Sequence, residues 1–139
     1  MSELRPDEAV ALARNATSAA ASMMPHVWQV ERSDRIGEAY YLIVFGDEQA
    51  PTAICAVAAN GGTIMASAKL GGTNRHIKVD ETDALKIANL DASDAKLVWQ
   101  PCRASFSPLY PFWRVSNPSR TVFIDQQGNC WDGLPSGRG

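Results

Sequence analysis

The feature that most constrains the fold of this chain is a similarity between its two halves. The tripeptide Val-Trp-Gln occurs at 27–29 and again at 98–100, an offset of 99 − 28 = 71 residues. Two further pairs of segments follow in the same order along the chain. These pairs are 39–45 over 110–116, at the same offset, and 58–61 over 125–128, at an offset of 67. A consistent order of similar segments indicates two copies of one structural unit.

The first half opens with a segment of helical character. Pro6 suits the first turn because its missing N–H would have no partner there, and the acidic residues that follow favour the positive end of the helix dipole. Apolar residues then recur at helical spacing. These residues are Ala9, Leu12, Ala13, Ala16, Ala20 and Met23. We predict a helix that Pro25 ends, with a stripe of small residues that can approach a sheet closely.

Strands are predicted after each helix, from runs rich in β-branched and aromatic residues. Their ranges are 27–31, 39–45, 52–58, 63–70, 97–100, 112–115 and 121–125. Asn60-Gly61-Gly62 is a strong hairpin signal, because asparagine and glycine tolerate a positive φ. Gln-Gln-Gly-Asn at 126–129 takes its place in the second half. Asp80 is the expected N-cap of a short second helix.

The domain boundaries follow from this pattern. We expect a first half over 1–70, a linker over 71–79 that Gly71 makes pliable, a second half over 80–134 and a disordered tail over 135–139. At 139 residues the two halves suit a single compact domain.

Composition excludes several classes of function. Hydrophobic residues make up 45% of the chain and the net charge is −2, with lysine and arginine scattered. A binder of duplex nucleic acid normally shows a basic stripe, so we expect neither a nucleic-acid nor a membrane partner. We find no signal peptide and no 18-residue apolar span, which predicts a cytoplasmic location. Three cysteines without CxxC spacing argue against disulfides and zinc, and we expect no metal or cofactor.

Cys130 raises the question of a catalytic thiol. A tryptophan follows it and glutamines precede it, as at the nucleophile of papain-type proteases. Such an enzyme needs a histidine well downstream, but His26 and His76 both lie upstream. Moreover, Ile64 or Met65 holds the corresponding place in the first half. We therefore interpret Cys130 as a strand residue after a turn, and we predict no catalytic residue.

The densest aromatic stretch, 107–114, is a candidate partner-binding region. Tyr110, Trp113 and Arg114 are its candidate contact residues, and Pro111 favours a sheet edge or a strand entry. An edge there would accept an extended peptide from a partner. The alternative is an ordinary core strand preceded by a proline-rich loop.

Two other features have a functional and a structural interpretation. Arg75 and His76 give the linker a local positive charge, which would suit an acidic partner or simply a solvated linker. Trp28 and Trp99, in the repeated tripeptide, would form a binding pair or occupy equivalent core positions between helix and sheet. We favour equivalent core positions for these tryptophans.

A family resemblance is carried by the second half. It runs from an acidic helix start at 80–88 through Tyr-Pro-Phe-Trp-Arg-Val at 110–115 to a hairpin at 121–131. This order is similar to that of PepSY-type domains. Their hairpin pattern V-x-V-D-x-x-G-x-V is matched by Val122, Ile124, Asp125, Gly128 and Cys130. The first half departs from the pattern, with Ala58 where the family has aspartate, although Gly61 or Gly62 keeps the turn.

The resemblance implies a fold class and a kind of function. The fold would be α+β, with two helix-plus-antiparallel-meander halves of cystatin-like or PepSY-like plan in one compact domain. PepSY-type domains are non-catalytic, and they are proposed to bind or restrain peptidases and membrane proteins. Similar small cytoplasmic proteins also occur among bacterial toxin-immunity proteins.

Three hypotheses follow for the function. The first is a non-catalytic protein-binding or inhibitory module that presents a sheet face or edge to a protein partner. The second is a small-ligand binder or an enzyme, with a cavity in a curled sheet that combines His26 or His76 with an acid or Cys55. The third is a homodimer formed through an exposed edge strand.

Overall fold

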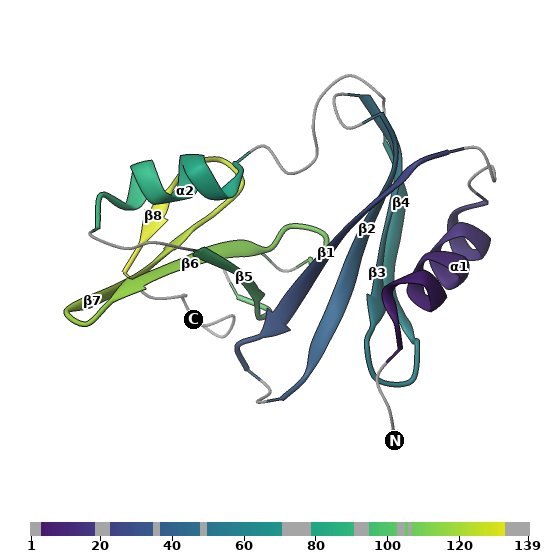
Figure 1. The fold of residues 1–139 in the computed structure, drawn as a ribbon, viewed down its shortest axis with the longest axis horizontal. Helices are drawn as coiled ribbons and strands as arrows, with labels where there is room; N and C mark the ends of the chain where they lie inside the picture. Colours follow the sequence, from purple (N-terminus) through teal and green to yellow (C-terminus); the bar gives the residue numbers. More distant parts are fainter. Residues whose placement is uncertain are drawn as a thin grey trace. The chain divides into compact units, whose positions relative to one another are not determined.

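The structure is a computed structural model that describes residues 4–18, 23–34, 37–47, 50–70, 79–90, 95–102, 105 and 107–132 (Figure 1). The chain divides into two compact units, Met1–His76 and Ile77–Gly139. This division falls inside the segment 71–79 that the sequence predicts as a linker. No helix in the described ranges is long and apolar enough to cross a membrane.

The first unit contains one helix and four strands. In chain order they are α1 (Pro6–Thr17), β1 (Pro25–Arg32), β2 (Ala39–Asp47), β3 (Ala50–Ala58) and β4 (Ile64–Lys69). The second unit also contains one helix and four strands. They are α2 (Glu81–Ala88), β5 (Ala95–Trp99), β6 (Phe112–Asn117), β7 (Arg120–Ile124) and β8 (Cys130–Trp131). Within each unit every strand pairs antiparallel with the next one along the chain.

The predicted fold class, α+β with two helix-plus-antiparallel-meander halves, is wrong. Of the described residues 49% lie in strands and 19% in helices, so the structure is mostly sheet. The physical reason is the source of the core. The helices bury only alanines, Ala9 and Ala13 in α1 and Ala84 and Ala88 in α2, whereas the largest fully buried side chains all lie in strands. The helices therefore contribute little to a core that is built mainly from strand residues.

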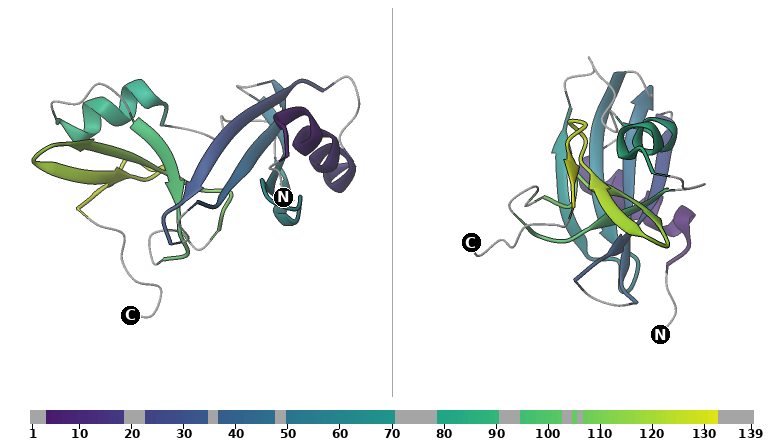
Figure 2. Two further views of the ribbon diagram at one scale, coloured as in Figure 1. Left: turned by 60° about the horizontal axis from the view of Figure 1, so that its bottom comes forward. Right: turned by 90° about the vertical axis from the view of Figure 1, so that its left-hand side faces the viewer.

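Helix α1 packs on one face of the strands of its own unit, as Figures 1 and 2 show. The core between them is built from the two alanines of α1 and alternate residues of β2 and β3. The strand residues are Tyr41, Ile43, Phe45, Ala53, Cys55 and Val57. The guanidinium of Arg14 lies over the Phe45 ring, 4.9 Å from its centroid, which adds a cation–π contact to the packing.

Helix α1 is shorter than the sequence predicts. It ends at Thr17, because Ser18 adopts the left-handed conformation (φ 56°, ψ 29°) and its N–H donates to the Arg14 carbonyl oxygen. Pro25 therefore begins β1 instead of ending the helix. The helix starts are as predicted: Pro6 lies in the first turn of α1, and Asp80 caps α2 by accepting the Asp83 N–H at 2.8 Å.

The segment before each helix is held by a buried aromatic side chain from its own unit. In the first unit the Tyr41 hydroxyl donates to the Leu4 carbonyl oxygen at 2.8 Å. In the second unit the Trp113 indole N–H donates to the Val79 carbonyl oxygen at 2.6 Å. Leu4 and Val79 each lie two residues before the start of a helix. We call this arrangement the helix latch.

The two side chains of the helix latch, Tyr41 in β2 and Trp113 in β6, occupy corresponding places in the two units, and the neighbouring residues can be aligned from them. Tyr40 pairs with Val30 and Phe112 pairs with Val98, and all four are fully buried. The offset is therefore 112 − 40 = 72 between β2 and β6, and 98 − 30 = 68 between β1 and β5. The offset of 71 from the repeated tripeptide is wrong in both places. A slip of one residue moves a side chain to the other face of a sheet.

The slip also changes the interpretation of the two tryptophans. Trp28 pairs with Leu42, on the face opposite the α1 core, and is half-buried. Trp99 is buried, with 4% of its surface exposed. By the offset of 68, the counterpart of Trp28 is Lys96, not Trp99. The prediction that Trp28 and Trp99 occupy equivalent core positions is wrong.

Candidate functional site

The partner-contact residues predicted in the aromatic stretch lie on or before β6. This strand has β5 on one side and β7 on the other, so it is an inner strand, and Pro111 marks its entry and not a sheet edge. Tyr110 is 49% exposed, Arg114 is half-buried and Trp113 is buried in the helix latch. The two linker candidates, Arg75 and His76, lie outside the described residues. Among the three described candidates, only Tyr110 is largely exposed, and Trp113 is engaged inside its own unit.

Gln126 extends the helix latch of the second unit. Its side-chain oxygen accepts the Val79 N–H at 3.2 Å, and its side-chain nitrogen donates to the Pro111 carbonyl oxygen at 3.2 Å. This glutamine is buried, and it ties the turn after β7 both to the start of α2 and to the entry of β6. Trp113 and Gln126 thus have hydrogen-bond partners inside their own unit.

Cys130 lies where the sequence analysis predicts, on a strand after a turn. It is exposed and pairs with Ile124 in the β7–β8 ladder. The turn is organised by Asp125, whose carboxylate accepts hydrogen bonds from the backbone of Gln127 and Asn129 and from the Trp131 indole at 3.0 Å. Burial alone would raise the pKa of Asp125, but these hydrogen bonds outweigh it and lower the pKa below its ordinary value.

Of the residues of the second sequence hypothesis, His26 and Cys55 are kept apart by the sheet, and His76 lies outside the described residues. Cys55 faces α1 in the core, and burial raises the pKa of its thiol to about 11. His26 pairs with Val44 on the opposite face, and its Nε2 lies 3.0 Å from the Gly46 carbonyl oxygen. Because adjacent strand residues point to opposite faces, His26 and Cys55 do not form a catalytic pair. The described residues also contain no group of three histidine, cysteine or acidic side chains that could hold a metal.

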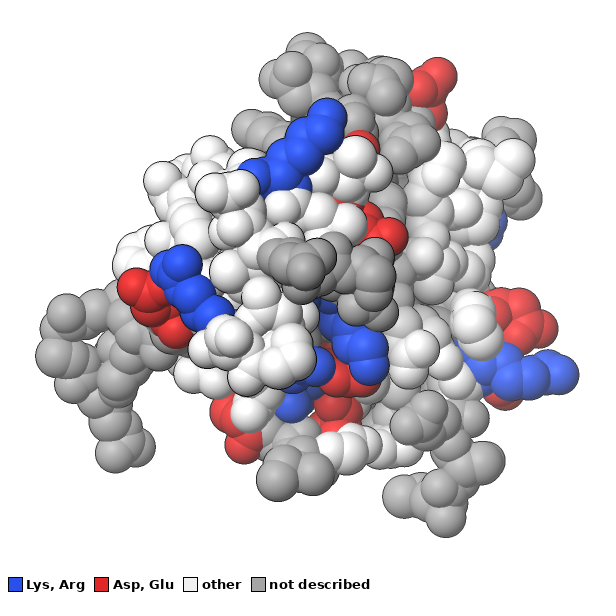
Figure 3. Space-filling view, turned by 60° about the vertical axis from the view of Figure 1, so that its left-hand side comes forward, with Lys and Arg blue, Asp and Glu red and all other residues white. Residues whose placement is uncertain are grey.

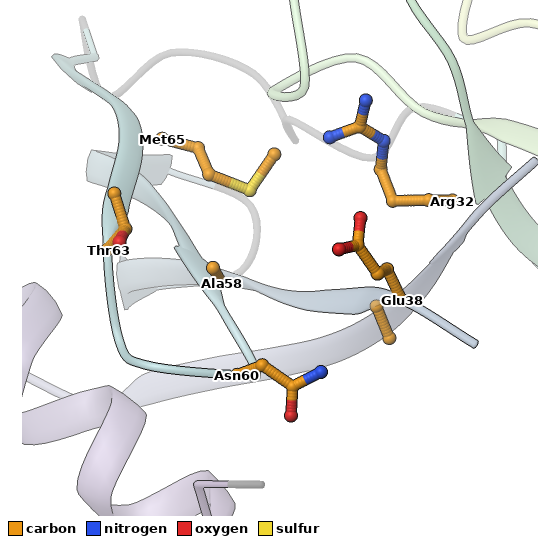
Figure 4. Close-up of a pocket in the computed structure, with 7 residues that line it drawn as sticks. Arg32, Glu38, Ala58, Asn60, Thr63 and Met65 are labelled. Atoms are coloured by element: carbon orange, nitrogen blue, oxygen red, sulfur yellow. The ribbon is translucent and has the colours of Figure 1, made fainter. Parts of the chain in front are cut away.

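A pocket of about 290 Å³ lies at one end of the strands of the first unit (Figure 4). This end carries both the β1–β2 and the β3–β4 connections, since the strands are antiparallel. The pocket is lined by Arg32, Glu38, Ala39, Ala58, Asn60, Thr63 and Met65. We call it the strand-end pocket. Its volume lies at the lower limit of roughly 300–1,000 Å³ for small-molecule sites, so it suits one long side chain better than a cofactor.

The charged residues in the described lining of the strand-end pocket are Arg32 and Glu38, and Arg32 is paired with Asp34. Arg32 donates from Nε and from one terminal nitrogen to the two carboxylate oxygens of Asp34, at 2.9 and 2.8 Å. The hydrogen bond to Asp34 raises the pKa of Arg32 above its ordinary value, although burial acts in the opposite direction. Arg32 therefore stays a cation, paired with one carboxylate, and a second carboxylate from Glu38 faces the pocket.

The strand-end pocket lies where the second unit is filled. Val57 pairs with Ile64, as Ile124 pairs with Cys130, so Ala58, the next residue of β3, corresponds to Asp125. The register shift between Ala56 and Val57 adds Met65 to β4 as an extra residue without a pairing counterpart in β8. The turns agree: the Ala58 N–H donates to the Thr63 carbonyl oxygen and the Asp125 N–H to that of Asn129. In the second unit, aspartate and tryptophan are joined by a hydrogen bond at this place. In the first unit, Ala58 offers no such acceptor, and both Ala58 and Met65 line the strand-end pocket.

Strand β4 forms the free edge of the first unit next to this pocket. It stands at the end of the strand order, and among the described strands it pairs with β3 alone. Four of its six residues are exposed, and the half-buried Met65 at its start also lines the pocket. The central residues Ala66, Ser67 and Ala68 are small and leave the backbone accessible. No described strand pairs with the outer side of β4, so its N–H and C=O groups on that side can accept a further strand.

Comparison with known proteins gives no match. No family model, no curated protein and no solved structure is significantly similar to this chain. The candidate site therefore rests on its geometry.

The sequence analysis did not identify the strand-end pocket. One signal was present: Ala58 stands where the PepSY-type pattern has aspartate, and that substitution removes the side chain that organises the corresponding turn of the second unit. The contribution of Arg32 and Glu38 has no signal in the sequence, because they come from strand ends that the register brings together.

Proposed function

We propose that this protein is a non-catalytic protein-binding or inhibitory module, of the toxin-immunity or peptidase-restraining kind. It binds an extended segment of a protein partner by adding that segment as a strand to β4. The observation that carries the proposal is the free edge of β4, which is six residues long and mostly exposed. The other end of the strand order is β8, which has two residues and offers a much shorter edge.

An added strand can gain both affinity and specificity at the edge of β4. Main-chain hydrogen bonds between β4 and the segment supply affinity, and pockets for individual side chains supply specificity. A lysine, Lys69, at one end of β4 and the bulge near Val57 at the other limit pairing between two copies of the edge. These features favour a chosen partner segment over a homodimer through β4.

The surface charge supports a protein partner. On the face in Figure 3, basic and acidic side chains are interspersed. The PepSY-like segments of the second half support the same class of function. The resemblance contributes only the kind of function; the position of the binding edge comes from the strand order.

The alternative, a small-ligand binder or enzyme, has the strand-end pocket in its favour. The described lining residues include no histidine, cysteine or serine, and the only basic group among them, Arg32, stays protonated. The Glu38 carboxylate and the Thr63 hydroxyl are the groups of this lining that could act as a base or a nucleophile, and no histidine or cysteine among the described lining residues stands beside them. We propose that the pocket serves recognition rather than catalysis.

The proposal is tested with proline variants of the edge. Adjacent residues of a strand direct their N–H groups to opposite sides, so of Ser67→Pro and Ala68→Pro one loses a donor to β3 and the other loses a donor of the free edge. Each variant and the wild-type chain are used as bait in native lysate, and the captured partner is identified by mass spectrometry. Circular dichroism shows which variant keeps the fold.

The two possible results are distinct. We expect the variant that keeps its fold to lose the partner that the wild-type chain captures in stoichiometric amount. Retention of that partner by a folded edge variant would contradict strand addition at β4. Proline at exposed Ser119 removes one hydrogen bond of the β6–β7 turn, from the Ser119 N–H to the Asn117 side-chain oxygen, away from the β4 edge. It is the matched control and should leave capture unchanged.

A further inference from the structure

We propose that Asn60 is a site of spontaneous covalent modification, at which the side-chain amide is converted into an aspartate and, mainly, an isoaspartate. The reaction needs only water and the backbone nitrogen of Gly61. This inference does not depend on the proposed function, because it concerns the chemistry of the turn between β3 and β4.

The first argument is the residue that follows Asn60. Of the six asparagines in the chain, this is the only one followed by a glycine. In the reaction, the backbone nitrogen of the next residue attacks the side-chain carbonyl carbon of asparagine, and a side chain on that next residue hinders the approach. Glycine has no Cβ, so Gly61 leaves its nitrogen accessible.

The second argument is that the fold leaves both reacting groups accessible. Asn60 and Gly61 are exposed, in the turn over 59–62, and Asn60 lies at the strand-end pocket (Figure 4). Within the described ranges neither the Asn60 side chain nor the Gly61 N–H makes a hydrogen bond, since the turn is closed by the Gly62 N–H, which donates to the Ala58 carbonyl oxygen at 3.2 Å. A Cβ built on Gly61 would meet no atom within 4 Å. The two groups can therefore approach each other without first breaking a hydrogen bond.

Other asparagines show how a fold can prevent this approach. The side-chain oxygen of Asn117 accepts two backbone N–H groups at 2.9 Å, and the proline after it has no N–H. The side chain of Asn129 donates to the Asp125 carboxylate at 3.1 Å. Asn89 is exposed like Asn60, but a leucine follows it. Asn89 is therefore the comparison that separates exposure from the effect of the next residue.

The reaction balances with these groups and water. The Gly61 nitrogen loses its proton and forms a bond to the side-chain carbonyl carbon of Asn60. The bond from that carbon to the amide nitrogen breaks, and ammonia leaves with the proton. Water then opens the resulting succinimide ring: attack at the side-chain carbonyl gives aspartate, and attack at the main-chain carbonyl gives isoaspartate.

Both products change the turn between β3 and β4. Each adds one negative charge to the rim of the strand-end pocket, which Asn60 lines. Isoaspartate also places the former side-chain methylene in the main chain and so lengthens the turn by one atom. The Ala58 N–H donates to the Thr63 carbonyl oxygen across this turn at 2.8 Å. We expect the longer turn to weaken this hydrogen bond and the β3–β4 hairpin.

The experiment follows oxygen uptake from isotopically labelled water. The folded full chain is incubated in H₂¹⁸O and then digested in ordinary water, so that mass spectrometry identifies each amide converted during the incubation. We expect Asn60 to convert faster than Asn89, and faster at mildly alkaline than at mildly acidic pH, because the Gly61 nitrogen must lose its proton. Conversion of Asn60 no faster than that of Asn89 would overturn the proposal.

The same incubation in guanidinium chloride shows what the fold contributes. Asn60 should convert at a similar rate in the folded and the unfolded chain, because folding gives its side chain no hydrogen bond. Asn129, which is bonded to Asp125, should convert more slowly in the folded chain. A rate for Asn60 that falls on folding as much as that of Asn129 would contradict the accessibility of the turn.

Two variants locate the reaction, with circular dichroism as the check that each one folds. Asn60→Gln requires a larger ring for cyclisation and should lose the label in the peptide over 36–69. Asn15→Gln, at an exposed position of α1, should keep it. Label that persists in this peptide of the folded Asn60→Gln variant would place the reaction elsewhere.

The effect on the hairpin is measured on the converted protein. Its added negative charge allows ion exchange to separate it from the unconverted chain. The converted chain should unfold at a lower urea concentration, and equal midpoints for the two forms would contradict the expected weakening of the hairpin.

Discussion

The helix latch makes a prediction that can be worked out for a single atom. Tyr41→Phe removes the hydroxyl that donates to the Leu4 carbonyl oxygen at 2.8 Å and keeps the ring in the α1 core. A net hydrogen bond contributes about 1 kcal/mol, and the carbonyl left without this donor adds to the cost. Leu4 is half-buried, so water can replace part of the lost bond. We expect a loss of about 1–2 kcal/mol in the free energy of unfolding.

The assay is urea unfolding followed by circular dichroism. With a slope of about 2 kcal/mol per molar urea, the expected loss moves the midpoint down by about 0.5–1 M. Tyr110→Phe removes the same atom from a half-exposed side chain and is the matched control, with an expected change within about 0.5 kcal/mol. A midpoint for Tyr41→Phe no lower than that of the control would refute the latch as a stabilising contact.

Further predictions concern the second unit. Trp113→Phe removes the donor to a buried carbonyl and part of the ring volume, and should cost about 2–4 kcal/mol in urea unfolding; a loss below 1 kcal/mol would contradict the buried latch. Gln126→Ala breaks two buried hydrogen bonds and should cost about 2–3 kcal/mol in the same assay. The pKa of Asp125 is lowered on folding, so its contribution is complete above the unfolded value of about 3.9 and is lost as pH falls through the folded value. Trp131 fluorescence against pH checks this, and an unfolding free energy for Asp125→Asn that falls as steeply as the wild type below pH 4 would contradict it. Cys130→Ala should change stability by no more than about 0.5 kcal/mol and leave partner capture intact, because the thiol is exposed; lost capture in the folded variant would contradict the structural role.

The sequence was most informative where local chemistry determines the conformation. Gly62 and Gly128 both have a positive φ, of 73° and 87°, at the turns that the sequence analysis predicts. A side chain at Gly62 would also collide with Leu12 of α1. The start of α2 at Asp80 and the position of Cys130 on a strand follow from the same kind of local signal.

The sequence was least informative about the register of the strands and about the relative amounts of helix and sheet. The tripeptide Val-Trp-Gln repeats at an offset of 71 residues, but the two units correspond at an offset of 72 between β2 and β6 and of 68 between β1 and β5. Because burial alternates along a strand, an offset that is wrong by one residue places a side chain on the wrong face. The repeated tripeptide therefore predicts equivalent positions for Trp28 and Trp99, although their environments in the structure differ. The share of sheet was also underestimated, because the helices contribute only alanines to the core.

The candidate contact residues are predicted from the chemistry of their side chains alone, without the contacts that the fold gives them. Trp113 beside prolines suggests a binding surface, yet its indole has a backbone partner 34 residues away in the chain. The strand-end pocket depends on strand ends that antiparallel pairing brings together, and on a difference between two corresponding turns. Neither is visible before the register is known.

The most direct test of strand addition is amide hydrogen exchange of the chain alone and in complex with its captured partner. The account predicts that the amides of β4, residues 64–69, become protected in the complex, while those of β7 exchange at the same rate in both states. Protection confined to another part of the chain, with β4 exchanging as in the free protein, would contradict the proposed function.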